Sequence, residues 1–200
     1  MMKEAIQHLS LKDPVLSSII QRVGGYGIQF REPTFETLVR SIVFQQLSGR
    51  VASVIFGRLA AATGPLTPEN ILRLRPARMR KLGLSTQKTA YIRDLARHTR
   101  GGKLIFAELP AMDDAAVITH LTQVKGIGVW TAQMFLIFAL QRTDVLPTGD
   151  LGIRNAMRKA YGLEELPSPA RMEELAREWS PYCSVASWYL WRSLDSPVEL

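Results

Sequence analysis

The residues best able to do chemistry in this sequence lie between positions 124 and 150. Gly126, Ile127 and Gly128 form a glycine-bearing turn directly before a helical pattern, so several backbone N–H groups can point outward together. Such a turn suits an oxygen anion such as phosphate. Asp150 follows 22 residues after Gly128, at the start of a second helical pattern. A phosphate-binding turn and a carboxylate in one segment indicate chemistry on a nucleic acid.

Asp150 has two interpretations when the pattern is taken alone. It directly precedes the helical pattern that begins at Leu151, and an aspartate in that position commonly accepts hydrogen bonds from the free N–H groups of the helix. Capping is the commoner role of such a residue. A catalytic carboxylate is the alternative, and one aspartate can serve both roles.

The composition suits a polyanionic partner. The 200 residues include 25 Lys and Arg against 18 Asp and Glu, which gives a net charge of +7 and a pI near 9.9. An excess of this size favours a polyanion, although many basic proteins bind none. The basic residues are scattered along the chain and form no tail of like charge.

The same composition excludes several classes of site. Cys183 is the only cysteine, so the chain alone forms neither an intramolecular disulfide nor a four-cysteine iron–sulfur or zinc site. His8, His98 and His120 are far apart and lack metal-ligand spacing. The first residues lack the apolar core of a signal peptide, and no apolar stretch approaches about 18 residues. We therefore expect no membrane association, and a cytoplasmic, nucleoid-associated protein in a prokaryote or a nuclear one in a eukaryote.

The elements that position these residues are predicted to be helices. Capping residues, prolines at first helical positions and apolar residues at i, i+3, i+4 spacing recur along the chain. Helical patterns are expected at 13–24, 34–47, 51–62, 86–98, 113–123, 129–140, 151–161, 168–179 and 182–194, with short ones starting at 67 and 76. Residues 26–30 are the one candidate strand. About ten helices with short connections predict an all-α protein.

The organisation of the chain is less strongly marked. No repeat or low-complexity segment is visible, and the glycine pair Gly101-Gly102 is the best candidate for a boundary. The first and last helices could still pack together, which would give two helical lobes with a cleft between them.

Five segments within residues 13–194 resemble the HhH-GPD DNA glycosylase superfamily. LTQVKGIGVWTA (121–132) looks like its helix-hairpin-helix, and LPTGD, which ends at Asp150, looks like its Gly/Pro-rich loop with the catalytic aspartate. FQQLSGRVA (44–52), LGLSTQKTAYIRDLA (82–96) and WSPYCSVASWYLW (179–191) resemble the 3-methyladenine DNA glycosylase II (AlkA/Mag) branch. All five occur in the family's order, which makes the resemblance specific.

The resemblance implies the fold and its organisation. It implies an all-α, two-lobed fold with a central cleft, in one glycosylase domain over residues 1–200 with the helix-hairpin-helix at about 114–140. It also implies the compact form, without the N-terminal β-rich domain of the longer bacterial AlkA type.

Asp150 matches the essential carboxylate of the family. Cleavage of an N-glycosidic bond builds positive charge on the sugar in an oxocarbenium-like transition state, which a nearby carboxylate stabilises. A base alkylated at a ring nitrogen is already cationic and leaves as a neutral molecule, so no dedicated general acid is required. Asp150 could also orient or deprotonate the attacking water.

Trp130 separates hydrolysis from strand cleavage. In bifunctional relatives the matching position carries the lysine that attacks the sugar as a Schiff-base nucleophile, and an indole cannot do so. Lys125 is offset by five positions and is expected to face phosphate. We therefore predict a monofunctional glycosylase that leaves an abasic site.

The resemblance also assigns the substrate pocket and the wedge. The pocket residues are Trp130, Met134, Trp191 and Leu151; Met134 replaces a pocket tyrosine and so loses one aromatic wall. Leu47 matches the apolar wedge that enters the space left by a flipped nucleotide, and Gln46 could hydrogen-bond the orphaned partner base. An ordinary core leucine at a helix end is the alternative for Leu47.

Phosphate contacts are expected from the turn and from one arginine. Their residues are Lys125, Gly126, Ile127, Gly128 and Arg154, although a solvated helix face explains Arg154 equally well. In the superfamily the hairpin can also hold a structural monovalent cation through main-chain carbonyls, here those of Thr122, Val124 and Ile127. Cys183 is expected to be a buried small residue and not a nucleophile.

The sequence therefore predicts a glycosylase that flips and excises alkylated bases, of the 3-methyladenine and 7-methylguanine type, from double-stranded DNA. We expect no cofactor, no catalytic metal, no required protein partner and a monomer. One alternative is a superfamily member that acts on another lesion class. The other is a non-catalytic helix-hairpin-helix DNA-binding protein, which would need the hairpin but not Asp150.

Overall fold

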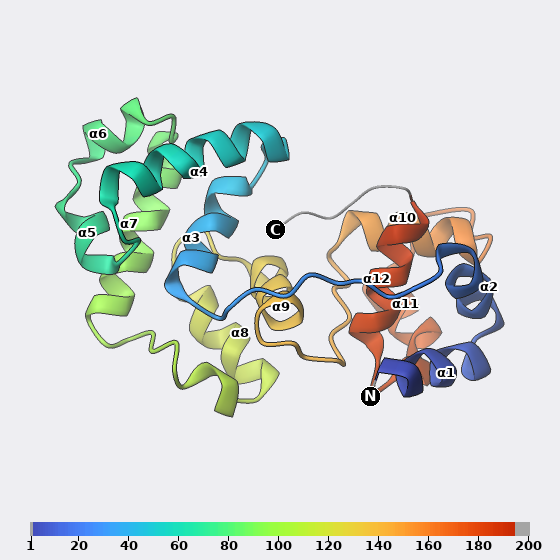
Figure 1. The fold of residues 1–200 in the computed structure, drawn as a ribbon. Helices are drawn as coiled ribbons and strands as arrows, with labels where there is room; N and C mark the ends of the chain where they lie inside the picture. Colours follow the sequence, from blue (N-terminus) through green and yellow to red (C-terminus); the bar gives the residue numbers. More distant parts are fainter. Residues whose placement is uncertain (1, 195–200) are drawn as a thin grey trace. The chain divides into compact units, whose positions relative to one another are not determined.

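The computed structural model describes residues 2–194 of the chain, and within them every regular element is helical (Figure 1). The all-α prediction is confirmed. The candidate strand at 26–30 is wrong, because this segment is extended backbone that pairs with no other strand among the described residues. No helix of the described part is long and apolar enough to cross a membrane.

The chain divides into two compact units, and the first joins its two ends. Among the described residues, unit 1 comprises 2–30 and 141–194. Its helices are α1 (Met2–Lys12), α2 (Pro14–Val23), α10 (Leu151–Ala160), α11 (Pro169–Leu175) and α12 (Cys183–Ser193). The last helix, α12, packs against α1, α2 and α10. The expectation that the first and last helices pack together is therefore confirmed.

The side chain of Asp13 connects α2 to two later segments of unit 1. Its Oδ1 accepts hydrogen bonds from the N–H groups of Val15 and Leu16 at 2.9 and 3.0 Å and so caps α2. Its Oδ2 accepts from Trp179 Nε1 at 2.8 Å and from the Tyr161 hydroxyl. Burial, together with the hydrogen bond to Asp13, raises the pKa of Tyr161. A carboxylate this buried is stabilised by having donors on both oxygens.

Unit 2 contains the middle of the chain, residues 31–140. Its helices are α3 (Phe35–Phe44), α4 (Gly49–Thr63), α5 (Pro68–Arg73), α6 (Pro76–Lys81), α7 (Thr86–Arg100), α8 (Asp114–Thr122) and α9 (Val129–Phe138). Helix α7 lies at the centre and packs against α3, α5 and α6, while α8 packs on α9. This unit therefore contains both the hairpin and the predicted wedge.

The boundary predicted at Gly101-Gly102 is wrong. The pair lies inside unit 2, where Gly101 ends α7 and Gly102 has a φ of 70°. After the pair the chain returns to the same core, because the ring of Phe106 packs against the rings of Phe35 and Phe135. The two glycines therefore mark a helix end and a turn, and the units meet in sequence at 30/31 and 140/141.

Candidate active site

Asp150 caps helix α10 in unit 1. Its backbone is extended, with φ −77° and ψ 118°, and its Oδ1 accepts a hydrogen bond from Ile153 N at 2.8 Å. The residue is only 7% exposed. The capping interpretation of Asp150 is therefore confirmed, and capping places the carboxylate at the positive end of the helix dipole.

Trp191 provides a second donor to the same oxygen. Its Nε1 donates to Asp150 Oδ1 at 2.9 Å, and the indole is 2% exposed. The donor comes from α12, 41 positions further along the chain. Trp191 was expected as a flat wall of the substrate pocket, and the structure adds that the edge of its ring orients the carboxylate.

Gly152 makes room for this pair. A Cβ at Gly152 would lie 3.0 Å from Asp150 Oδ1 and 3.3 Å from Trp191 Cδ1, which is tighter than ordinary contact. A side chain here would press on both members of the hydrogen bond. The sequence analysis missed Gly152, although a glycine within the first turn of a helix that follows a functional aspartate is a usable signal.

Three other predicted residues of unit 1 have distinct surroundings. Leu151, the first residue of α10, is 59% exposed. Arg154 is half-buried, and its Nε donates to the Pro167 carbonyl at 3.1 Å, so part of the guanidinium has a structural role. Cys183 is buried, as expected, and burial raises the pKa of its thiol, which disfavours the nucleophilic thiolate.

The hairpin of unit 2 is a tight turn whose amides are not equivalent. Lys125 N donates to Asp94 Oδ2 at 2.9 Å, and Ile127 N donates to Val124 O at 3.1 Å. The prediction that the Ile127 amide faces phosphate is therefore wrong, because the turn itself uses this N–H. Gly128 is the N-cap of α9, and no side chain caps the first turn of that helix.

The predicted wedge lies at an exposed tip between α3 and α4, here called the Gln46 loop (residues 45–48). Leu47 is 38% exposed, so the alternative of an ordinary core leucine is wrong. Gln46 has a φ of 57°, in the left-handed region that a residue with a Cβ rarely adopts. Such a conformation persists only where its surroundings fix it.

Two side chains fix the Gln46 loop. Lys88 of α7 donates from Nζ to the carbonyls of Val43 and Gln45, both at 2.6 Å. Gln45 in turn donates from Nε2 to Gly126 O at 3.0 Å, which ties the loop to the hairpin. Burial lowers the pKa of Lys88. The sequence analysis did not single out Lys88, because nothing local shows that it reaches carbonyls more than 40 residues away.

A pocket of about 390 Å³ lies between the hairpin and the Gln46 loop, entirely within unit 2. Its lining comprises Ser41, Phe44, Gln45, Gln46, Gly126, Gly128, Trp130 and Thr131. Trp130 is 38% exposed here, as a pocket residue should be. Met134 does not line this pocket and is fully buried, because it lies one helical turn further into α9. That Met134 lines the substrate pocket therefore stays a prediction.

The sequence and the structure of this chain are similar to those of one family of proteins. The model for the HhH-GPD superfamily base excision DNA repair protein matches residues 39–181. A putative DNA-3-methyladenine glycosylase of Bacillus subtilis is 32% identical over 90% of this chain and 66% of its own length, so the chain spans about two thirds of that relative.

Two solved structures are similar over nearly the whole chain. The DNA-3-methyladenine glycosidase of Bacillus halodurans has a TM-score of 0.85 and 37% identity, covering 94% of this chain and 88% of that one. The 3-methyladenine DNA glycosylase Mag1 of Schizosaccharomyces pombe, in complex with abasic DNA, has a TM-score of 0.84 and 34% identity, covering 94% and 95%.

Proposed function

The chain belongs to the HhH-GPD superfamily of base excision DNA repair proteins, and from this premise we propose that it is a monofunctional DNA glycosylase for alkylated bases in double-stranded DNA. The observation that carries the proposal is the buried carboxylate of Asp150, oriented by Ile153 N and Trp191 Nε1 on one oxygen. Relatives named as 3-methyladenine DNA glycosylases support the substrate class.

The chemistry follows from a positioned negative charge. As the N-glycosidic bond breaks, positive charge develops on the deoxyribose, and a carboxylate fixed in advance stabilises it without reorganisation. The alkylated base departs as a neutral molecule, so the leaving group needs no proton from the protein. Water completes the reaction, and an abasic site remains in the strand.

Unit 2 supplies the proposed contacts with DNA. The amides of Gly126 and Gly128 and the N-terminus of α9, which no side chain caps, suit a backbone phosphate. Leu47 at the tip of the Gln46 loop is exposed and apolar, which suits a wedge into the base stack. We propose that the chain acts as a monomer, since each of these groups belongs to one copy.

Mass spectrometry of released bases tests the proposal. Duplex DNA methylated by a broad-acting reagent should release 3-methyladenine and 7-methylguanine on incubation with the protein. Release of oxidised bases alone, from a separately oxidised duplex, would favour the other lesion class. A protein that binds the duplex but releases no base from either would be the non-catalytic helix-hairpin-helix module.

No covalent intermediate is expected with abasic DNA. Trp130 occupies the position at which bifunctional relatives carry a lysine, and an indole cannot form a Schiff base. Borohydride reduction in the presence of abasic-site DNA should therefore leave the protein at its unmodified mass. A bifunctional superfamily member trapped in parallel is the positive control. An adduct that peptide mapping assigns to any lysine or to the N-terminal amine would contradict the monofunctional assignment.

Lys88→Met should impair the excision of lesions from duplex DNA more than from single-stranded DNA. Losing the two 2.6 Å hydrogen bonds to Val43 O and Gln45 O releases the Gln46 loop from its left-handed conformation. A charge-assisted hydrogen bond contributes about 1.5–3 kcal/mol, so single-turnover excision from duplex DNA should fall about tenfold or more. The same lesion in single-stranded DNA, which needs no wedge, should be released at nearly the wild-type rate.

Arg93→Met is the matched control for this prediction. Arg93 also lies on α7, and its guanidinium donates to the carbonyls of Leu74 and Leu72 at 2.7 and 3.4 Å, at the C-terminal end of α5. Its loss should cost comparable stability while reducing duplex and single-strand excision equally. If Lys88→Met behaved in the same way, Lys88 would be a general structural residue.

A further inference from the structure

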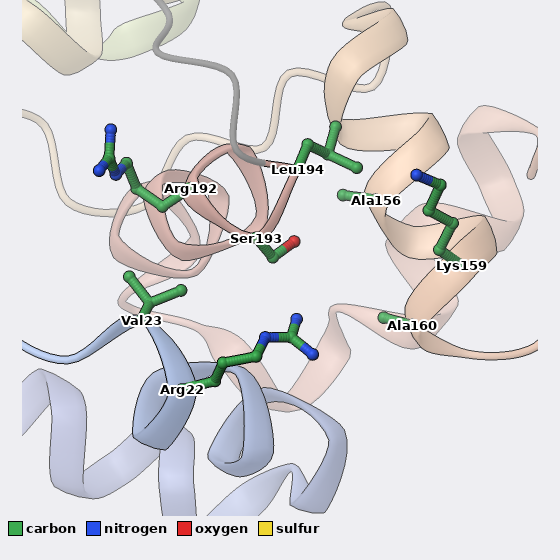
Figure 2. A pocket seen from close by; sticks show the side chains of 8 residues that line it. All are labelled: Arg22, Val23, Ala156, Lys159, Ala160, Arg192, Ser193 and Leu194. Atoms are coloured by element: carbon green, nitrogen blue, oxygen red, sulfur yellow. The ribbon is translucent and has the colours of Figure 1, made fainter.

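A second pocket, of about 570 Å³, lies in unit 1 between the ends of α2, α10 and α12. Its lining comprises Arg22, Val23, Ala156, Lys159, Ala160, Arg192, Ser193 and Leu194. Figure 2 shows Arg22 reaching from α2 toward α10, where Lys159 and Ala160 lie opposite, while Arg192 stands at the rim with its guanidinium turned away. The volume is in the range of small-molecule sites, about 300–1,000 Å³.

The charge of this pocket is of one sign. Among the described residues, its lining holds three cationic side chains and no carboxylate. Within residues 2–194, no acidic side chain forms an ion pair with Arg22, Lys159 or Arg192. The three cations repel one another, and an anion bound among them is attracted to each of them and so offsets that repulsion.

Helix dipoles explain part of this arrangement. Each of the three cations lies in the last turn of its helix, where a positive charge interacts favourably with the carbonyl end. That effect accounts for the position of each cation at the end of its helix. It does not account for three helix ends that surround an open space, nor for the small side chains that keep the space open. Ala156 and Ala160 lie one turn apart on the same face of α10.

We propose that this pocket binds phosphate groups that carry at least two negative charges. Arg22 and Lys159 are the principal contacts, and Arg192 joins them by a rotation of its side chain. The backbone of a bound duplex and a free phosphorylated molecule offer the same chemistry. The backbone alternative rests on the proposed function, whereas phosphate binding itself is independent of any reaction at Asp150.

Pyrophosphate is the probe for the site. It should raise the melting temperature of the wild-type protein in a concentration-dependent way and shift the amide resonances of residues 22–24, 156–160 and 192–194. The double variant Arg22→Gln/Lys159→Gln should lose both responses. Lys3→Gln/Arg171→Gln, which removes the same charge from exposed residues of unit 1 outside the pocket, should keep them.

Ala160→Met separates a shaped site from general electrostatic attraction. The longer side chain fills the hollow while all three cations remain. The affinity of the protein for pyrophosphate should fall at least tenfold if the pocket is the site. An unchanged response in Ala160→Met would overturn the proposal, as would equal responses in the two charge variants.

Undamaged duplex DNA distinguishes the two sources of phosphate. If the pocket takes backbone phosphates, the slope of log K against log salt should become shallower by about 0.9 for each lost contact in Arg22→Gln/Lys159→Gln. An unchanged slope together with pyrophosphate binding would support a free phosphorylated ligand. Neither readout requires base release, so failure of the proposed glycosylase activity and failure of this proposal are distinguishable.

Discussion

Replacement of Asp150 by asparagine is expected to reduce base release from methylated duplex DNA by about 100- to 1,000-fold, the range found when a positioned electrostatic group is removed from a transition state. Asparagine keeps the shape of the side chain but carries no negative charge to stabilise the developing oxocarbenium ion. Single-turnover assays with saturating protein measure the chemical step and exclude effects on affinity.

The structure explains why asparagine is the informative substitution. Ile153 N and Trp191 Nε1 both donate to Oδ1 of Asp150, and an amide oxygen can accept both hydrogen bonds. Asparagine is also as good an N-cap as aspartate. Melting temperature and affinity for undamaged duplex should therefore remain close to wild type.

Asp150→Ala provides the contrast. It removes the helix cap, which costs about 1 kcal/mol of folding stability. It also leaves the buried indole N–H of Trp191 without its acceptor, which costs about 1–3 kcal/mol more. If Asp150→Asn retained full base release while Asp150→Ala lost it together with stability, Asp150 would be a capping residue only, and the catalytic assignment would fail.

The hydrogen bonds of Asp150 show how much of the site the sequence could predict. Capping depends on residues three positions apart, so local pattern predicted it correctly. The hydrogen bond from Trp191 joins residues 41 positions apart, and no local pattern contains that information. The same limit applies to Lys88, which reaches carbonyls 43 and 45 positions earlier in the chain.

Errors in the sequence analysis arose where one residue type serves two structural purposes. Gly101-Gly102 was taken as a boundary, but glycine ends a helix as readily as it begins a linker, and here it does the former. Helix α1 was not predicted at all.

The hairpin illustrates a third limit, which concerns backbone groups. A glycine-bearing turn predicts that amides are exposed, but it does not say which of them the turn uses. Ile127 N donates to Val124 O, and Lys125 N donates to Asp94 Oδ2. Each assignment depends on the handedness of the turn, which is set by the φ of 85° at Gly126.

Gly126→Ala is accordingly expected to destabilise unit 2 strongly. The φ of 85° lies in the left-handed region, which costs a residue with a Cβ about 1–3 kcal/mol. The added Cβ would also lie 2.1 Å from Cδ2 of Tyr91, an overlap that the ring must relieve by moving. Overpacking of this kind costs about 1–3 kcal/mol, so urea unfolding should show a total loss of about 2–6 kcal/mol.

A double-mutant cycle divides this loss between its two causes. Tyr91→Ala removes the ring that the new Cβ would meet, so Gly126→Ala should cost less in that background, and only the backbone strain should remain. An equal cost in both backgrounds would show that the contact with Tyr91 is not a source of the instability.

Gly128→Ala separates folding from DNA binding at the next glycine. Gly128 has a φ of −94°, and a Cβ there would meet no atom within 4 Å, so stability should change by less than about 1 kcal/mol. The new methyl group would nevertheless stand beside the uncapped N–H groups of α9, where a phosphate must approach closely. Affinity for duplex DNA should therefore fall although the protein stays folded. If Gly128→Ala bound DNA as tightly as wild type, the phosphate would have to lie elsewhere on the hairpin, and the helix N-terminus would not be its site.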